Sequence, residues 1–497
     1  MNAAVARIAR WRVHLIAVVV LLILVDVAAL GGADATSVVR ATRAEKAAQA
    51  ASQQATSSGI PSEALQAGTV AGSASGPAAA GGATGARLPG VASAPGRHVT
   101  YDDGASDTEV KIGGSTFTSG PAATYGEQIA VGFAAGVNYV NDHGGINGRR
   151  LSVKIYDDGA DPAKQLANIK RLVEVDHVFA LSMSYAPISG EYAYKVGIPV
   201  FLEGQFDEDF FHPWYFGIGG PQSTSAMSMA WYGAKKLGIK SVSVFYLDAG
   251  ANNYSKAFAD KVASYWKAYG VDVKAEVPFT PDQTSCSQGI SEASGDKVDY
   301  VDFQIDAGHV IQCMVEAQIQ GYKPPKLWGG YLIGVPVIHQ ALGDYSIGTY
   351  AFDAFADEYK NPDYIAEVKK VSNKTDTYSS VTMGFFLSAL LAADGMRQLG
   401  DQFTRAHLKD VLNTFTDWRP GLTNSDNQPK WTFSPQCHIG IRGGYVIQIH
   451  KQPDGSLRWD QITPQGVGSP IPPGQSVPTF FQGCRGYFVP GETAAPF

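Results

Sequence analysis

From about residue 106 onward, the spacing of hydrophobic residues changes repeatedly between two periods. Val110 and Ile112 alternate with polar residues, which is the pattern of a β-strand. From Ile129 to Val140, apolar side chains recur at every third or fourth position, which predicts an amphipathic helix. The folded region is therefore expected to open with a strand followed by a helix.

Residues 140–165, "VNDHGGINGRRLSVKIYDDGADPAKQ", contain the junction between that helix and the next two elements. The glycine pair at 144–145 ends the helix, because glycine enters the left-handed backbone region at little cost. The Asn-Gly pair at 147–148 predicts a tight turn. The apolar residues of 151–155 then alternate as a second strand.

Two aspartates, Asp157 and Asp158, end that second strand. Open α/β sheets bind ligands outside the carboxyl ends of their strands, so these carboxylates are candidates for contact with a ligand. The alternative is that they cap the loop and face solvent. Asp161 is expected to cap the next helix, with Pro162 at its first position. This order of elements is typical of a parallel α/β sheet.

The same two periods continue along the chain and predict two α/β units. Further strands are expected at residues 177–184, 198–204, 240–248, 271–279, 299–306 and 325–332. Helices are expected at 186–196, 223–237, 258–266, 379–399 and 404–415, with another that ends at Gly321. Residues 443–450 and 457–463 flank a Pro-Asp-Gly turn and predict a β-hairpin.

The N-terminal part differs in composition and falls into two segments. Residues 1–35 hold arginines before an apolar run at 15–25, which Asp26 interrupts. This is the pattern of a secretory signal peptide, with a cleavage site near Ala33–Ala35, or of an uncleaved membrane anchor. Residues 36–105 are rich in Ala, Gly and Ser and poor in large apolar residues, which predicts a disordered tether.

Charge and cysteine usage narrow the possible partners. The chain of 497 residues has a formal net charge of -7, which gives no basic surface for nucleic acid. Its four cysteines lack the spacing of a metal site, and an even number in an exported chain favours disulfides over four free thiols. Three pairings are possible, and we expect the sequence neighbours to pair: Cys286 with Cys313 and Cys437 with Cys484.

Three motifs follow one another between residues 120 and 181: a helix ending in Asn-x-x-Gly-Gly-Ile-x-Gly, a strand ending in Tyr-Asp-Asp, and a helix starting at Asp-Pro. In this order they resemble the leucine/isoleucine/valine-binding family of periplasmic binding proteins, which are type I solute receptors of ABC importers. The similarity of layout continues to about residue 460. The resemblance implies an α/β fold of two lobes, each a mostly parallel sheet flanked by helices, joined by three hinge crossovers.

The resemblance also implies how the chain divides between the lobes. The first lobe is expected to hold residues 106–221 plus 352–440, and the second lobe 222–351 plus 441–465. Residues 466–497, which are rich in proline and glycine, are expected to wrap the surface as a tail pinned by a disulfide.

Ligand contacts of the family carry over to the positions where the motifs match. The resemblance implies contacts from Tyr125, from Ser184, from Tyr254 and from Asp306 or Ala307. These positions lie near the ends of predicted strands or at the starts of helices, where a ligand between two lobes would be reached.

The chain departs from the family pattern in one loop and at one further position. Gln205 and Phe206 replace the small-residue and threonine loop that grips the carboxyl and ammonium groups of an amino acid. Tyr331 replaces the glutamate that neutralises the ammonium group. A buried zwitterion without these partners would be poorly paired, which argues against a free branched-chain amino acid as ligand. Glu203, Asp248 or Asp306 could supply a replacement partner for the ammonium group.

Aromatic side chains take the place of the charged clamp. Six fall near the ends of predicted strands: Phe117, Tyr125, Tyr185, Phe206, Tyr254 and Tyr331. Aromatic rings with a polar tip suit an uncharged or weakly polar organic ligand. We expect about three of the six to touch ligand and the others to belong to the core of a lobe.

The resemblance implies an extracytoplasmic solute-binding protein that captures a small organic ligand and delivers it to an ABC permease. The expected ligand is amino-acid-like, an amide or a weakly polar organic molecule. No nucleotide-binding or nucleophile motif occurs, so neither a cofactor nor catalysis is expected. The alternatives are a ligand-sensing or adhesion module with the same fold, and an exported hydrolase. The protein would be tethered to the membrane by its N-terminal segment or secreted after cleavage.

Overall fold

A computed structural model describes most of the chain from residue 99 onward. The described residues are 99–119, 123–183, 189–202, 207, 212–249, 254–330, 333–355, 358–373, 378–423, 430–441, 443–463, 467–476 and 488–490. They belong to one compact unit, residues 51–497. Within this part of the chain, no helix has both the length and the apolar character needed to cross a bilayer. The predictions for residues 1–35 and for most of the tether lie outside it.

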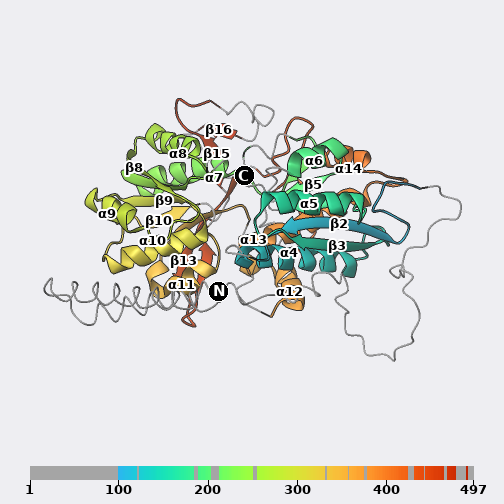
Figure 1. The fold of residues 1–497 in the computed structure, drawn as a ribbon, viewed down its shortest axis with the longest axis horizontal. Helices are drawn as coiled ribbons and strands as arrows, with labels where there is room; N and C mark the ends of the chain where they lie inside the picture. Colours follow the sequence, from blue (N-terminus) through green and yellow to red (C-terminus); the bar gives the residue numbers. More distant parts are fainter. Residues whose placement is uncertain are drawn as a thin grey trace, which may run out of the picture. The chain divides into compact units, whose positions relative to one another are not determined.

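One parallel sheet of the described chain has five strands in the order β3-β2-β4-β5-β6 (Figure 1). Its strands are β2 (Glu109–Thr116), β3 (Arg150–Asp157), β4 (Ala180–Met183), β5 (Val200–Leu202) and β6 (Tyr215–Gly217). The accompanying helices are α4 (Ala123–Asp142), α5 (Pro162–Glu174), α6 (Ser189–Val196), α12 (Pro362–Val371), α13 (Ser380–Arg397) and α14 (Arg405–Leu412). We call this sheet and these helices lobe one.

The two longest helices of lobe one, α4 and α13, pack against each other at very short range. A Cβ atom on Gly132 would lie 2.2 Å from the carbonyl oxygen of Thr382, and one on Gly136 would lie 2.6 Å from that of Phe386. Only glycine permits so close an approach of two backbones. The contacts advance in the same direction along both helices, so α4 and α13 run parallel and begin at the same end of the lobe.

The second sheet has nine strands in the described chain, in the order β16-β15-β13-β11-β10-β9-β7-β8, with β14 paired to β13 (Figure 1). Its strands are β7 (Ser241–Leu247), β8 (Asp272–Phe279), β9 (Tyr300–Gln304), β10 (Trp328–Gly330), β11 (Tyr350–Asp353), β13 (Gly443–Lys451), β14 (Leu457–Gln461), β15 (Val467–Ile471) and β16 (Phe488–Pro490). Its helices are α7 (Gln222–Tyr232), α8 (Lys256–Ala268), α9 (Ser287–Gly295), α10 (Ala307–Ile319) and α11 (Val337–Leu342). We call this sheet and these helices lobe two.

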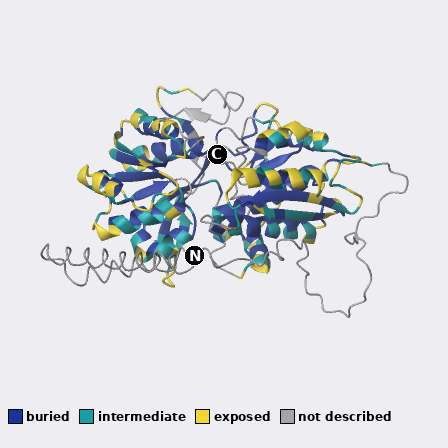
Figure 2. Ribbon diagram, in the orientation of Figure 1, coloured by how far each residue is buried: buried dark blue, intermediate teal, exposed yellow. Residues whose placement is uncertain are grey.

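Most of the elements expected from the hydrophobic periods are present, and the hairpin of β13 and β14 is antiparallel as predicted. The junction at residues 144–148 is confirmed by positive φ angles of 88° at Gly144, 63° at Gly145, 52° at Asn147 and 82° at Gly148. Asp161 caps α5 through the backbone N–H groups of its first turn, with proline at the start of the helix. The inner strands of both sheets, such as β2, β4, β9 and β10, are largely buried, whereas many exposed residues lie on the helices and loops (Figure 2).

Several short elements were not predicted. Strand β1 (Thr100–Tyr101) pairs with β12 (Gln402–Phe403), so ordered structure begins before residue 106. Strands β6 and β11 have three and four residues, which is too short for the alternation of apolar and polar residues to be recognised. Strand β11 pairs within lobe two, and the chain crosses toward lobe one after it.

The tail also contributes to lobe two instead of only lying on its surface. Gly468 of β15 pairs with Gly443 of β13, and β16 pairs with the outer edge of β15. Ile471 packs against the hydrophobic cluster around α7. The Gln475 side-chain amide donates to the Ser264 hydroxyl on α8 at 2.9 Å. These contacts join the end of the chain to two helices of lobe two.

The expected disulfide between Cys286 and Cys313 is present. It joins the residue that precedes α9 to the middle of α10, and both cysteines are buried. The expected pairing of Cys437 with Cys484 lies outside the described residues, because Cys484 does.

Candidate functional site

The chain passes between the two lobes after β6, after β11 and before β13, and these passages lie side by side. The Gly217 N–H donates to the His438 carbonyl at 3.1 Å, which joins the end of β6 to the segment that approaches β13. Asp353 at the end of β11 pairs with Tyr445 of β13. The three connections therefore form one region in which the lobes meet.

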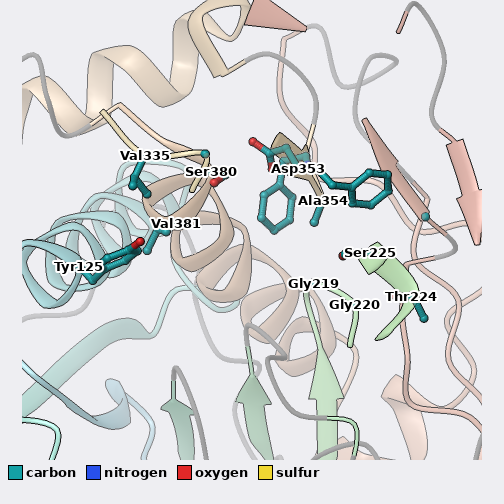
Figure 3. A pocket seen from close by; sticks show the side chains of 14 residues that line it. Tyr125, Gly219, Gly220, Thr224, Ser225, Val335, Asp353, Ala354, Ser380 and Val381 are labelled. Carbon is teal, nitrogen blue, oxygen red and sulfur yellow. Dashed lines mark hydrogen bonds between the residues drawn. The ribbon is translucent and has the colours of Figure 1, made fainter. Parts of the chain in front are cut away.

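A pocket of about 50 Å³ lies in this region (Figure 3). Residues of both lobes line it: Tyr125, Gly219, Gly220, Thr224, Ser225, Gly334, Val335, Phe352, Asp353, Ala354, Phe355, Ser380, Val381 and Gly443. A buried water needs roughly 10–15 Å³ of space for its centre, so the pocket has room for only a few waters. The lobes are thus nearly in contact around it.

Three helices begin at this pocket. Helix α4 contributes Tyr125, α7 contributes Thr224 and Ser225, and α13 contributes Ser380 and Val381, all from the first turns. The first N–H groups of a helix have no acceptor within the helix, and the aligned peptide dipoles make that end positive. At α7 the Thr224 N–H already donates to the Pro221 carbonyl at 3.0 Å. The starts of α4 and α13 therefore favour a hydrogen-bond acceptor in the pocket.

The remaining walls are mainly apolar. Val335, Phe352, Phe355 and Val381 are all nearly inaccessible to solvent. Asp353 is the one acidic residue among the described residues of the lining, and one of its carboxylate oxygens accepts the Phe355 N–H at 3.0 Å. The lining thus combines apolar surface with donors from the helix starts, which is the usual make-up of a site for small organic ligands.

The structure describes three of the residues predicted to contact the ligand, and only one of them lines the pocket. Tyr125 lines the pocket. Tyr254 does not line it, and packs against the core cluster that contains α10. Asp306 caps α10: its carboxylate accepts the Gly308 N–H at 2.9 Å and lies 2.5 Å from Nδ1 of His309. Burial alone would raise the pKa of Asp306, but the hydrogen bonds and the positive charge of His309 hold it below the ordinary value.

Other predicted positions lie outside the described residues: Ser184, Tyr185, Glu203, Gln205, Phe206 and Tyr331. Phe117 is described and packs against the same hydrophobic cluster as Tyr254, which contains residues of both lobes. The roles expected for the undescribed residues therefore stay predictions.

Asp157 and Asp158 hold the loop after β3. Asp157 accepts the Ser119 N–H at 3.0 Å, the Ser119 hydroxyl at 2.6 Å and the Gly159 N–H at 3.1 Å. Burial alone would raise the pKa of Asp157, yet these hydrogen bonds keep it below the ordinary value. Asp158 is fully buried and accepts the Ser115 hydroxyl at 2.8 Å and the Ala160 N–H at 2.9 Å. These contacts fit the interpretation that the two aspartates cap the loop, but Asp158 does not face solvent as that interpretation expected.

The sequence did not identify most residues of the pocket. Val335, Phe352 and Phe355 lie on connections or at the end of a short strand, where no period marks a buried position. A local signal existed for Ser380, because the Ser-Ser pair before the long apolar stretch of α13 is a helix start.

Residues 109–454 match the family model described as periplasmic binding protein. A stretch of 64 residues is 39% identical to the Leu/Ile/Val-binding protein homolog 1 of Brucella abortus, and it covers 13% of this chain and 17% of that relative. The matched stretch is therefore a small part of the relative's length.

Solved structures are similar over most of the chain. The branched-chain amino acid transporter substrate-binding protein LivJ from Streptococcus pneumoniae, solved with isoleucine, has a TM-score of 0.59 and 17% identity and covers 72% of this chain and 100% of its own. A solute-binding protein of an ABC transporter from Rhodopseudomonas palustris BisB5, in complex with 3,4-dihydroxybenzoic acid, has a TM-score of 0.62 and 17% identity, covering 75% and 100%. At this identity the likeness establishes the fold, which is that of a type I periplasmic binding protein.

Proposed function

Because the chain belongs to the periplasmic binding protein family, we propose that it captures a small organic ligand between its two lobes and delivers it to an ABC permease. The observation that supports this most directly is the pocket where the three connections meet, since both lobes line it. A ligand held there would contact lobe one and lobe two at once, and its binding would favour the closed arrangement. The family works outside the cytoplasm, and we propose that the N-terminal segment directs export and is then cleaved or kept as an anchor.

The lining supports a ligand with one hydrogen-bond acceptor group and an apolar body. The starts of α4 and α13 would receive a carboxylate or an amide oxygen. Tyr125, Phe352 and Phe355 would pack against the apolar part. Relatives of known structure bind isoleucine and 3,4-dihydroxybenzoic acid, so both chemical classes belong in a test.

Both lobes line the pocket, which in the described arrangement has room for only a few waters. A ligand therefore enters only when the lobes move apart. We propose that the lobes rotate apart about the three connections to admit the ligand and close around it afterwards.

The first experiment is thermal unfolding of residues 98–497 with a panel of compounds. The panel holds leucine, isoleucine, 3,4-dihydroxybenzoate, 4-hydroxybenzoate and the corresponding amides. A ligand at about 100 times its Kd stabilises the protein by roughly 2.7 kcal/mol, which raises the Tm by a few degrees. A rise with one chemical class and not the others would identify that class, whereas no rise with any compound would count against small-molecule capture.

A variant pair on one helix tests the pocket once a compound is found. We expect Tyr125→Ala to raise the Kd by about tenfold or more, because an aromatic wall is lost. Tyr139→Ala is the matched control: Tyr139 lies on the same helix, but its hydroxyl donates to the Gly421 carbonyl and it does not line the pocket. Equal effects of both substitutions on the Kd would place the ligand elsewhere.

The same titration tests two further tyrosines that the sequence analysis places near the ligand. We expect Tyr254→Ala and Tyr331→Ala to weaken binding without unfolding the protein. If the Tm of the unliganded variants falls as far as it does when a buried core residue is replaced by alanine, the two tyrosines are core residues instead.

A further inference from the structure

Asp207 lies between β5 and β6 of lobe one, yet its carboxylate contacts two helices of lobe two. One oxygen is 2.6 Å from Nζ of Lys261 on α8, and the other accepts the Ser223 N–H in the first turn of α7 at 3.4 Å. These contacts are separate from the three chain connections. They give the two lobes an additional polar link.

The carboxylate of this ion pair is buried, so the pair differs from one on the surface. The side chain of Asp207 is 4% exposed and that of Lys261 is 26% exposed. Exposed ion pairs contribute little, because water and salt screen them. A buried carboxylate that loses its cation, in contrast, is left with an uncompensated charge. Removal of Lys261 should therefore make the arrangement in which Asp207 is buried against α8 less favourable.

The contact with Ser223 has a specific structural reason. The N-cap residue of α7 is Pro221, whose side chain makes no capping hydrogen bond. Asp207 reaches the second N–H of the helix and supplies the missing acceptor from the other lobe. The next two residues of that turn, Thr224 and Ser225, line the pocket. Asp207 thus holds the turn that presents lobe two to the pocket.

We propose that Asp207 is a positioning residue that latches the lobes in the closed arrangement through Lys261. Ser223 follows the first connection by two residues, so it moves little when the lobes rotate about that connection. Lys261 lies on α8, away from the connection, so its distance from Asp207 changes with the angle between the lobes. The ion pair is therefore made on closure and broken on opening. The inference rests on the proposed function only in that this closure would enclose the ligand.

The test measures the arrangement of the lobes without any ligand. Spin labels are placed by Val175→Cys at the end of α5 and Ile319→Cys at the end of α10, because these side chains are 65% and 54% exposed. The distance distribution is recorded by pulsed electron paramagnetic resonance on the full chain. We expect Lys261→Met and Asp207→Asn to raise the population of a second distance by about twofold or more.

Two control variants separate the latch from a general effect on stability. Lys256→Met removes an exposed lysine of the same helix that pairs with Asp260 and Glu276 within lobe two, and it should leave the distribution unchanged. Lys261→Arg keeps the charge and should restore the distribution of the parent protein. Identical distributions in Lys261→Met and Lys256→Met would overturn the proposal, even if the Tm had fallen.

The outcome is independent of the ligand panel, because no ligand is added. If Asp207→Asn fails to fold, Lys261→Met alone decides, since it removes the partially exposed member of the pair. If the distance distributions show the latch but no compound of the panel binds, the inference about Asp207 holds and the proposed function is wrong. If a compound binds but the variants leave the distribution unchanged, the proposed function holds and the inference about Asp207 is wrong.

Discussion

At the scale of single residues, Asp302 is a carboxyl group inside lobe two. It lies on β9 with 1% of its surface exposed and accepts hydrogen bonds from Trp266 Nε1 at 2.7 Å and from the Gln304 side chain at 2.8 Å. Gln304 in turn accepts from Gln222, the first residue of α7, at 3.0 Å. Burial raises the pKa of Asp302 to about 6, although these hydrogen bonds lower it in part.

This carboxyl group makes the stability of the protein depend on pH in a defined window. Between pH 3.8 and about 6 the native state keeps a proton that the unfolded chain has released. The free energy of unfolding therefore falls as pH rises through the window, by about 3 kcal/mol in all. Urea unfolding at several pH values should show this fall in the parent protein and not in Asp302→Asn. Parallel pH profiles of the two proteins would assign the dependence to other groups.

At the scale of elements, β15 shows how the end of the chain supports α7. Helix α7 is buried over nearly its whole length, since every residue from Gln222 to Trp231 is inaccessible or almost so. Ile471 at the end of β15 belongs to the residues packed against that cluster. The helix thus depends on a strand that lies beyond the part matched by the family model.

A pair of isoleucine substitutions tests this dependence. Ile471→Ala should reduce the free energy of unfolding by about 1–2 kcal/mol, because the side chain is half-buried and a fully buried one costs roughly 2–5 kcal/mol. Ile319→Ala removes the same atoms from a side chain that is 54% exposed, and it should stay within about 0.5 kcal/mol of the parent protein. Equal losses in urea unfolding would mean that β15 does not support α7.

Elements with a clear period were predictable, and contacts between distant parts of the chain were not. The alternation at Val110 and Ile112 and the glycines after α4 carry their structure locally. The pairing of Gly443 with Gly468 has no local signal, and Pro470 argues against a strand because proline lacks an N–H donor. In the pocket, Tyr125 lies at a position that a matching motif had singled out, whereas its neighbours come together only through the connections between the lobes.

At the scale of the whole molecule, the three adjacent connections allow the lobes to move as bodies. Each lobe has its own sheet, and the connections at Gly217 and Asp353 are tied to the segment that enters β13. Rotation about this single region would open the pocket while both sheets stay intact. The arrangement of the lobes should then respond to a ligand more than the internal structure of either lobe does.

Small-angle X-ray scattering tests this expectation with a compound identified by the unfolding panel. A saturating amount should decrease the radius of gyration, because ligand held by both lobes favours closure. Far-ultraviolet circular dichroism should stay the same, because no strand or helix is gained. Tyr125→Ala at the same ligand concentration should give a smaller decrease. An unchanged radius with bound ligand would mean that the pocket fills without movement of the lobes.

The order of the strands also determines when the protein is able to fold. Helices α12 to α14 complete lobe one only after the strands up to β11 have been synthesised, and β13 lies inside the second sheet between β11 and β15. Lobe one therefore lacks helices until α14 has been synthesised, and the second sheet lacks an inner strand until β13 has been synthesised. Because contacts between distant residues form slowly, we expect the final packing of both lobes to form late in synthesis.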